Sequence, residues 1–165
     1  MPIISSVSRR MARSRKPVSG GSYLYYRWRI TNVRNFAVAV AVQASEFVFQ
    51  RGGVDVRPTA TVTNPGGSNP PGEEPDKLYD NSVDTKALDF NIKNTNVSIF
   101  LYTFSTAQTF TGYRWATAND ESDRDPITWT VEGSNNNSTW TTLHTVTNYS
   151  PTASRKTYVG PWTYP

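Results

Sequence analysis

The sequence predicts an all-β protein, an antiparallel β-sandwich of one domain. Aromatic residues make up 13% of its 165 residues and charged residues only 18%, a balance typical of β proteins with long polar loops. Short runs of aromatic and β-branched residues alternate with polar ones. Turn signals rich in Gly, Pro, Asn and Asp separate these runs roughly every ten residues, as in a sandwich or barrel. A chain of this length can enclose one hydrophobic core.

The expected strands begin near residue 23. In residues 23–33, Tyr26, Trp28 and Ile30 alternate with other side chains, which predicts that they face the core. Residues 36–49 alternate Val with Ala, which favours a strand, or a tight loop leading into a strand, over a helix. A loop dense in Pro and Gly is expected at residues 64–75, and a short helical turn at residues 74–79. Further strands are expected at residues 54–63, 87–92, 98–105, 110–118, 128–134, 140–147 and 156–164.

Residues 1–22 are predicted to form a basic extended arm ahead of a domain at residues 23–165. They lack hydrophobic periodicity and end in Pro and Gly-Gly signals. The chain holds eight basic and no acidic residues before Glu46, and nine basic against thirteen acidic residues from there on. The basic side chains of the arm are Arg9, Arg10, Arg13, Arg15 and Lys16.

Several functions are open for this arm. It can tether the protein to neighbouring subunits of a large assembly, where Arg side chains pair with carboxylates. It can contact nucleic acid, because a short Arg run neutralises phosphates without sequence specificity. It can also be a solvated tail, and its Arg-rich, Ser-rich and acid-free composition is shared with organelle transit peptides. An arm of this composition needs a partner to order it, which favours the tether.

Composition excludes several kinds of site. The chain has no Cys, which excludes disulfides and thiolate metal sites, and its lone His144 excludes sites built from several His residues. The most apolar stretch, residues 36–44, is too short to span a membrane and is not a secretory signal. The sequence has no Ser-His-Asp order, no HExxH motif and no phosphate-binding loop. We therefore expect a non-enzymatic protein with no membrane span.

Three parts of the sequence share a pattern with a known family. They are EPDKLYDNSVDTKALDF, GYRWATANDESDRDPITWTVEGSNNNSTWTTL, and the pair YYRWRI and QASEFVF. Together they resemble the discoidin-like family, also called coagulation-factor type C or galactose-binding-like domains. The resemblance implies a β-sandwich of jelly-roll topology that binds glycans, lipid headgroups or proteins through loops at one end, and members occur in large viruses and phages. Two departures accompany it. Ala87 stands where the family usually has Trp, and the YYRWRI pair comes first, as in a circular permutation.

Residues 80–85, DNSVDT, match a loop that wraps a structural calcium in many relatives. The resemblance implies ligands from Asp80, Thr85 and Glu46, with Asp84 as an additional ligand. Calcium takes about six to eight oxygens, which loops rich in Asp, Asn and Thr can provide. The alternative is a turn whose Asx and Ser/Thr side chains hydrogen-bond their own backbone. In both cases the loop has a structural and not a catalytic role.

A second cluster of acidic residues lies at residues 120–125. A pair of carboxylates can act as acid and base, but catalytic carboxylates are normally held on rigid elements, and this run is one loop that contains Arg124. The resemblance makes Arg124 and Asp125 packing and salt-bridge residues. The four acidic residues are Asp120, Glu121, Asp123 and Asp125.

A glycan site needs an exposed aromatic face with a few polar groups beside it. Trp162 lies near the chain end and could anchor a surface contact, and the loops offer Tyr79, Tyr149 and Arg155 as glycan or partner contacts. Trp28, Trp115 and Trp129 fall in apolar strand registers and are expected in the core. The resemblance, in which Trp140 begins a strand, implies a core position for Trp140 as well.

These features predict a non-enzymatic structural or interaction protein, a minor capsid component that cements a large virion and is tethered by its arm. The alternative is a lectin-like carbohydrate-binding module for glycan recognition or host attachment. The expected partners are neighbouring capsid subunits, with glycans, and nucleic acid at the arm, as further partners. Calcium is the one cofactor that the sequence offers a site for.

Overall fold

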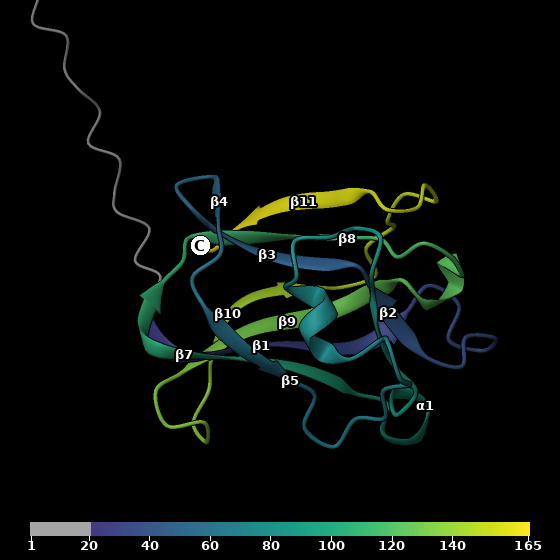
Figure 1. Ribbon diagram of the computed structural model, residues 1–165, viewed down its shortest axis with the longest axis horizontal. Helices are drawn as coiled ribbons and strands as arrows, with labels where there is room; N and C mark the ends of the chain where they lie inside the picture. The colour runs from purple at the N-terminus through teal and green to yellow at the C-terminus, as the bar shows by residue number, and fades with distance from the viewer. Residues whose placement is uncertain (1–20) are drawn as a thin grey trace, which may run out of the picture.

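The computed structural model describes residues 21–165, and this part of the chain is all-β with antiparallel sheets (Figure 1). The predicted fold class is confirmed at this level. Residues 1–20 of the predicted arm lie outside the described residues, and with them the basic side chains Arg9, Arg10, Arg13, Arg15 and Lys16.

The larger sheet has five strands in the order β10–β9–β1–β7–β5. Strand β1 lies at its centre and pairs antiparallel with β7 on one side and β9 on the other. The sheet consists of β1 (Ser22–Val33), β5 (Ala60–Thr63), β7 (Ser98–Thr109), β9 (Pro126–Ser134) and β10 (Thr141–Val146).

The second sheet has four strands in the order β11–β8–β3–β4, and a small third sheet pairs β2 with β6. The four-stranded sheet consists of β3 (Glu46–Arg51), β4 (Val54–Val56), β8 (Gly112–Ala116) and β11 (Tyr158–Thr163). The remaining elements are β2 (Val42–Ala44), β6 (Ala87–Asp89), the 3-10 helices η1 (Pro75–Leu78) and η2 (Ser122–Arg124), and the short helix α1 (Ile92–Thr95). The predicted helical turn at residues 74–79 is confirmed by η1.

The alternation along β1 decides which side chains enter the core. Tyr26, Trp28 and Ile30 are completely buried, as predicted. Successive side chains of a strand point to opposite faces, so Arg27 and Arg29 lie on the outer face of the five-stranded sheet. Both are only partly buried.

The two large sheets pack face to face through aromatic side chains. The ring of Trp28 lies 4.9 Å from that of Phe47 and 5.8 Å from that of Trp115, both on the four-stranded sheet, and 6.1 Å from that of Trp129 on its own sheet. Burial of three of the predicted core Trp residues, Trp28, Trp115 and Trp129, is therefore confirmed. Aromatic pairs at these distances add to the free energy gained by burying their area.

The prediction that Trp140 is a core residue is wrong. Its side chain is only partly buried, it precedes β10, and the guanidinium of Arg27 lies 4.1 Å from its ring centroid. Trp162, in contrast, packs against the aromatic core, with its ring 5.3 Å from those of Tyr113 and Trp129.

The segment before β2 also differs from the predicted strand. At residues 34–41 the chain turns, with the amides of Val38 and Ala39 both donating to the carbonyl of Asn35. Burial still alternates along residues 38–41, but the Ala side chains face inward and the Val side chains outward. Ala39 and Ala41 are buried, whereas Val38 is 65% exposed.

The predicted strand at residues 54–63 is divided between the two sheets. Strand β4 belongs to the four-stranded sheet and β5 to the five-stranded sheet. Pro58 lies between them and has no N–H to donate to a ladder. Similarly, the predicted strand at residues 87–92 ends at Asp89, and the chain continues into α1.

Both ends of the described chain lie at one end of the sandwich. Ser22 pairs with Thr109, and the amide of Tyr164 donates to the carbonyl of Thr111 at 2.9 Å. Adjacent termini are the condition that a circular permutation requires. Strand β3 begins at Glu46 and runs toward this same end, where the carbonyl of Gln50 accepts a hydrogen bond from the amide of Thr111. Glu46 therefore lies at the opposite end of the sandwich.

Replacing Trp28 by Ala should lower the free energy of unfolding by about 3–5 kcal/mol, since it opens a cavity between the two sheets. The thermal midpoint should fall by on the order of 10 °C. Val54→Ala is the matched control, because that side chain is 67% exposed and its loss should change the free energy by less than about 0.5 kcal/mol. Urea unfolding of both variants measures the difference, and equal effects would contradict the central place of Trp28.

Candidate functional site

The loop at residues 80–85 is closed by hydrogen bonds of its own. Thr85 Oγ1 donates to Asp80 Oδ2 at 2.7 Å, and the amide of Ser82 donates to Asp80 Oδ1 at 3.0 Å. Asn81 adopts a left-handed backbone conformation with φ of 64°, which Asn tolerates better than most residues. These are the contacts of an Asx turn.

Glu46 joins this loop from the beginning of β3. The amide of Ser82 also donates to Glu46 Oε1 at 2.9 Å, so that one N–H lies between the two carboxylates of Glu46 and Asp80. The second oxygen of Glu46 forms an ion pair with Arg57. The structure thus brings Asp80, Thr85 and Glu46 into one group.

Asp84 is not part of this group. Its carboxylate pairs with Lys156 Nζ at 2.7 Å, and the Asp84 side chain is 77% exposed. Within residues 21–165, no three acidic or His side chains gather closely enough to hold a metal ion by themselves. A cation at Asp80 and Glu46 would therefore also need hydroxyl and carbonyl oxygens as ligands. The hydroxyl oxygen of Thr85 and the carbonyl oxygen of Ser82, which lie 3.2 Å apart, are two such oxygens in the loop. These are the oxygen types that calcium binds.

The side chain of Glu46 is completely buried, and this controls its protonation. Burial raises the pKa of Glu46 to about 7, and the ion pair with Arg57 and the amide of Ser82 only partly oppose this effect. Glu46 therefore changes charge near neutral pH. The loop at residues 80–85 is hydrogen-bonded, through the amide of Ser82, to this carboxyl group.

The acidic residues at 120–125 do not form a catalytic pair. Asp125 is completely buried and its carboxylate is paired with two guanidinium groups, those of Arg34 at 3.1 Å and Arg155 at 2.5 Å. Its predicted role as a salt-bridge residue is confirmed. Arg124, by contrast, makes no ion pair with any residue in the 21–165 range.

Asp120 is held by the buried Lys86, whose Nζ lies 2.7 Å from both carboxylate oxygens. Burial alone would raise the pKa of Asp120, but hydrogen bonds from Lys86 and Gln43 outweigh it and lower that pKa below its usual value. A general acid needs a raised pKa, which the environment of Asp120 does not provide. The carboxylate of Asp125 is occupied by its two guanidinium partners.

His144 also has a structural partner. Its Nδ1 lies 2.9 Å from the hydroxyl of Tyr113, which accepts a hydrogen bond from Trp129 Nε1 at 2.7 Å. Burial lowers the pKa of His144. The Nδ1 atom of a neutral His144 can accept a hydrogen bond from the hydroxyl of Tyr113. No carboxylate is hydrogen-bonded to His144 in the described chain.

The residues predicted to contact glycans or partners are each engaged in contacts within the fold. The hydroxyl of Tyr79 donates to the carbonyl of Pro58 at 3.1 Å, and Tyr149 packs its ring against Trp129. Arg155 is bound to Asp125, which raises the pKa of Arg155. No ring contact or hydrogen bond joins Tyr79, Tyr149 and Arg155 to one another in the part of the chain described.

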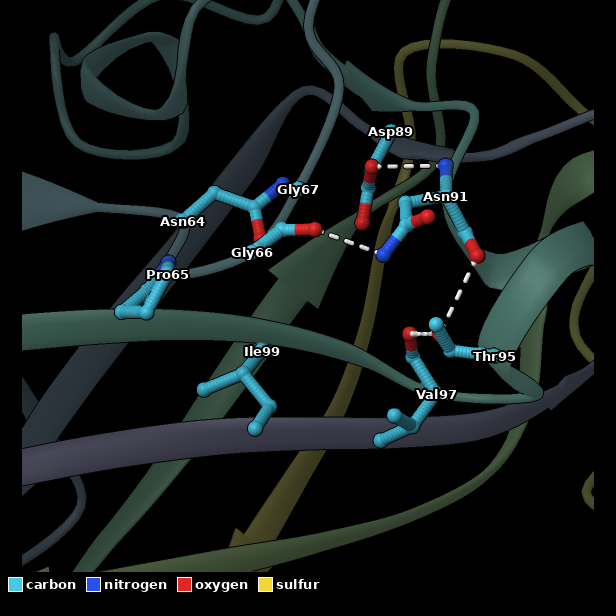
Figure 2. Close-up of a pocket in the computed structure, with 9 residues that line it drawn as sticks. All are labelled: Asn64, Pro65, Gly66, Gly67, Asp89, Asn91, Thr95, Val97 and Ile99. Atoms are coloured by element: carbon cyan, nitrogen blue, oxygen red, sulfur yellow. Dashed lines mark hydrogen bonds between the residues drawn. The ribbon is translucent and has the colours of Figure 1, made fainter.

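A hollow that sequence reasoning missed lies beside β7 (Figure 2). Its volume is about 200 Å³. The loop at residues 64–67 forms one side and Asp89 and Asn91 the other, with Asn91 Nδ2 donating to the carbonyl of Gly66 at 2.6 Å. The remaining lining residues are Thr95, Val97 and Ile99.

A second hollow of about 250 Å³ adjoins the first, and the two share Pro65 and Ile99. Its other lining residues are Arg27, Leu101, Asn137 and Trp140. The sequence indicates the two loops that line these hollows, NPGG at residues 64–67 and SNNNST at residues 134–139. It does not show that both loops line the same hollow, because that depends on which strands become neighbours in the sheet.

In comparisons with known proteins, the chain matches no family model, no curated protein and no solved structure. No helix among the described residues is both long enough and apolar enough to cross a membrane.

Glu46 should make stability depend on pH in the direction opposite to that of an ordinary paired carboxylate. Its pKa in the folded protein is about 7, above the usual value of 4.5. Between these values the folded state binds a proton that the unfolded chain has released, so the contribution of Glu46 to stability falls as pH rises from 4.5 to 7. Urea midpoints of wild type and Glu46→Gln across this range measure the effect, and the slope difference should vanish above about pH 8.

Glu121→Gln is the control, because this exposed side chain forms no ion pair within residues 21–165. It should keep the wild-type slope. A wild-type slope in Glu46→Gln as well would contradict a proton on Glu46.

Proposed function

We propose that the protein is a non-enzymatic structural or interaction protein, a minor capsid component of a large virion. In this proposal the described domain is a discoidin-like sandwich of jelly-roll topology, and residues 1–22 tether it to neighbouring subunits. Contact of the arm with nucleic acid is the alternative to this tether.

The observation that carries the non-enzymatic proposal is that the buried carboxylates all have structural partners. Glu46 pairs with Arg57, Glu132 with Arg27, and Asp125 with two Arg side chains. Asp89 accepts hydrogen bonds from the amides of Ser68 and Asn91 and from the hydroxyl of Ser98. Removing one partner from such a buried group is strongly destabilising, so these carboxylates are committed to contacts within the fold.

The tether is supported by the distribution of charge. All five basic residues of the arm precede the first acidic residue of the chain, and the part from Glu46 onward has four more acidic than basic residues. A basic arm of one subunit is thus complementary to the acidic part from Glu46 onward in another. The arm joins β1 at the end of the sandwich that does not carry Glu46.

Glycan recognition is the second function that we propose, and the hollows on the five-stranded sheet favour it. Together they place a partly exposed Trp beside several amide side chains. This combination can stack on the apolar face of a sugar and bind its hydroxyl groups.

We further propose that Asp80, Thr85 and Glu46 hold a structural calcium ion, with Ser82 contributing its carbonyl. The ion would stabilise the loop and take no part in a reaction. Asp84 is left out of this proposal because Lys156 binds its carboxylate.

Deleting residues 1–20 should leave the domain folded and abolish assembly, because β1 starts only at Ser22. The thermal midpoint should stay within about 2 °C of wild type, since all the strands and core side chains described above lie in residues 22–165. The protein should disappear from the pelleted high-mass particles of cells that produce it. A large fall in the midpoint would show that the arm belongs to the domain.

A full-length variant with the five basic arm residues changed to Ser separates charge from length. It should also fail to assemble. If the arm instead binds nucleic acid, the wild type should bind duplex DNA with an affinity that falls steeply with salt, and both variants should lose this binding. DNA binding of that kind together with unchanged particle recovery would contradict the tether.

Calcium should stabilise the folded protein, since it binds the folded state alone. At a hundredfold excess over Kd the gain is about 2.7 kcal/mol, or several degrees in the thermal midpoint. Because binding requires ionised Glu46, the gain should be smaller at pH 6 than at pH 8. Asp80→Ala should remove the response, and magnesium should replace calcium poorly.

Asp84→Ala is the matched control and should keep the response, because its carboxylate lies outside the group. Superimposable melting curves in calcium and in chelator would show that residues 80–85 are only a self-bonded turn.

A further inference from the structure

The two hollows form one groove on the outer face of the five-stranded sheet, which we call the Trp140 groove. It is lined by the residues of both hollows, from Asn64 and Asn91 at one end to Asn137 and Trp140 at the other. Ile99 belongs to both hollows and forms their common wall. The groove is on the outer face because Arg27 and Ile99 alternate along their strands with the buried Trp28 and Phe100.

Trp140 is held in a defined position at one end of the groove. The guanidinium of Arg27 lies 4.1 Å from its ring centroid. The loop before it is closed by Asn136, whose Oδ1 accepts hydrogen bonds from the amides of Ser138 and Thr139 at 3.0 and 2.8 Å. A large aromatic side chain that stays partly exposed on a prefolded loop is suited to stack on a ligand.

The charged side chains that line the groove are already satisfied. Arg27 is paired with Glu132, which also accepts a hydrogen bond from Thr130 Oγ1 at 2.8 Å. Asp89 is surrounded by the three neutral donors already described. A charged ligand would have to compete with these partners, so the lining favours a neutral one.

The remaining surface of the groove combines apolar and amide groups. Pro65, Ile99 and Leu101 form an apolar strip, and the amides of Asn64, Asn91 and Asn137 flank it. A pyranose ring has the complementary chemistry, with C–H groups on one face and hydroxyl groups around its edge. Hollows of about 200 and 250 Å³ are too small for a folded peptide element and suit one sugar ring each.

We propose that the Trp140 groove binds a short neutral oligosaccharide, with one sugar ring stacked on Trp140 and the next across Ile99 toward Asn91. The proposal rests on the second proposed function, glycan recognition, and adds its place and its chemical class. It locates the site on the face of a sheet and not at Tyr79, Tyr149 and Arg155.

The test is calorimetric titration of the full chain with neutral trisaccharides (maltotriose, cellotriose and a galactose trisaccharide) and with acidic ones (sialyllactose and a heparin tetrasaccharide). A neutral trisaccharide should bind the wild type, and Trp140→Ala should weaken it at least about tenfold. Tyr158→Ala is the matched control, because Arg114 lies 3.8 Å above that ring in the same kind of stack on the other sheet and Tyr158 lines neither hollow. It should bind as wild type does.

Ile99→Lys is a second test, because it places a long side chain across the wall shared by both hollows while leaving β7 paired. It should abolish binding, and thermal melting confirms that each variant is folded. Wild-type binding of a neutral sugar by folded Trp140→Ala and Ile99→Lys would overturn the groove and leave glycan recognition intact. Silence across all the saccharides would overturn both proposals. Binding of acidic saccharides alone, lost in Arg29→Gln, would show that an outer-face cation and not Trp140 is the site.

Discussion

The fold depends on the contact between the two large sheets at Trp28. This side chain comes from the central strand of one sheet, and its ring packs against Phe47 and Trp115 of the other. Because a strand alternates its faces, burying Trp28 also places Arg27 and Arg29 on the outside. The aromatic contact therefore sets the register of the core and, on the opposite face, the position of the guanidinium group that holds Trp140.

Polar groups that enter this aromatic interior need partners, and the chain provides them at every buried carboxylate. Asp125 is bound between Arg34 and Arg155, and Glu46 between Arg57 and the amide of Ser82. Leaving one of these charges unpaired would cost several kcal/mol. These pairs therefore join strands and loops far apart in the chain and are part of what holds the two sheets together.

The regions proposed to carry function occupy separate parts of the molecule. The arm joins the sandwich where Ser22 pairs with Thr109, whereas Glu46 and the loop at residues 80–85 lie at the other end of the four-stranded sheet. The Trp140 groove lies on the outer face of the five-stranded sheet. The proposals for the arm, the loop and the groove can therefore be tested one at a time, since each rests on different residues.

Local pattern was sufficient for the all-β class, for most strands and for three core Trp residues, because alternation and turn signals act over a few neighbouring residues. The family resemblance predicted that Asp80, Thr85 and Glu46 belong together, and hydrogen bonds connect them in the structure. The resemblance was wrong at Trp140, which it places in the core but which lies partly exposed beside Arg27. Neither local pattern nor the resemblance could show that Asp84 would be bound by Lys156, that Glu46 would be buried enough to raise its pKa to about 7, or that two loops would meet over Ile99. Those features join segments far apart in the chain, and only the packing of the two sheets decides which of them become neighbours.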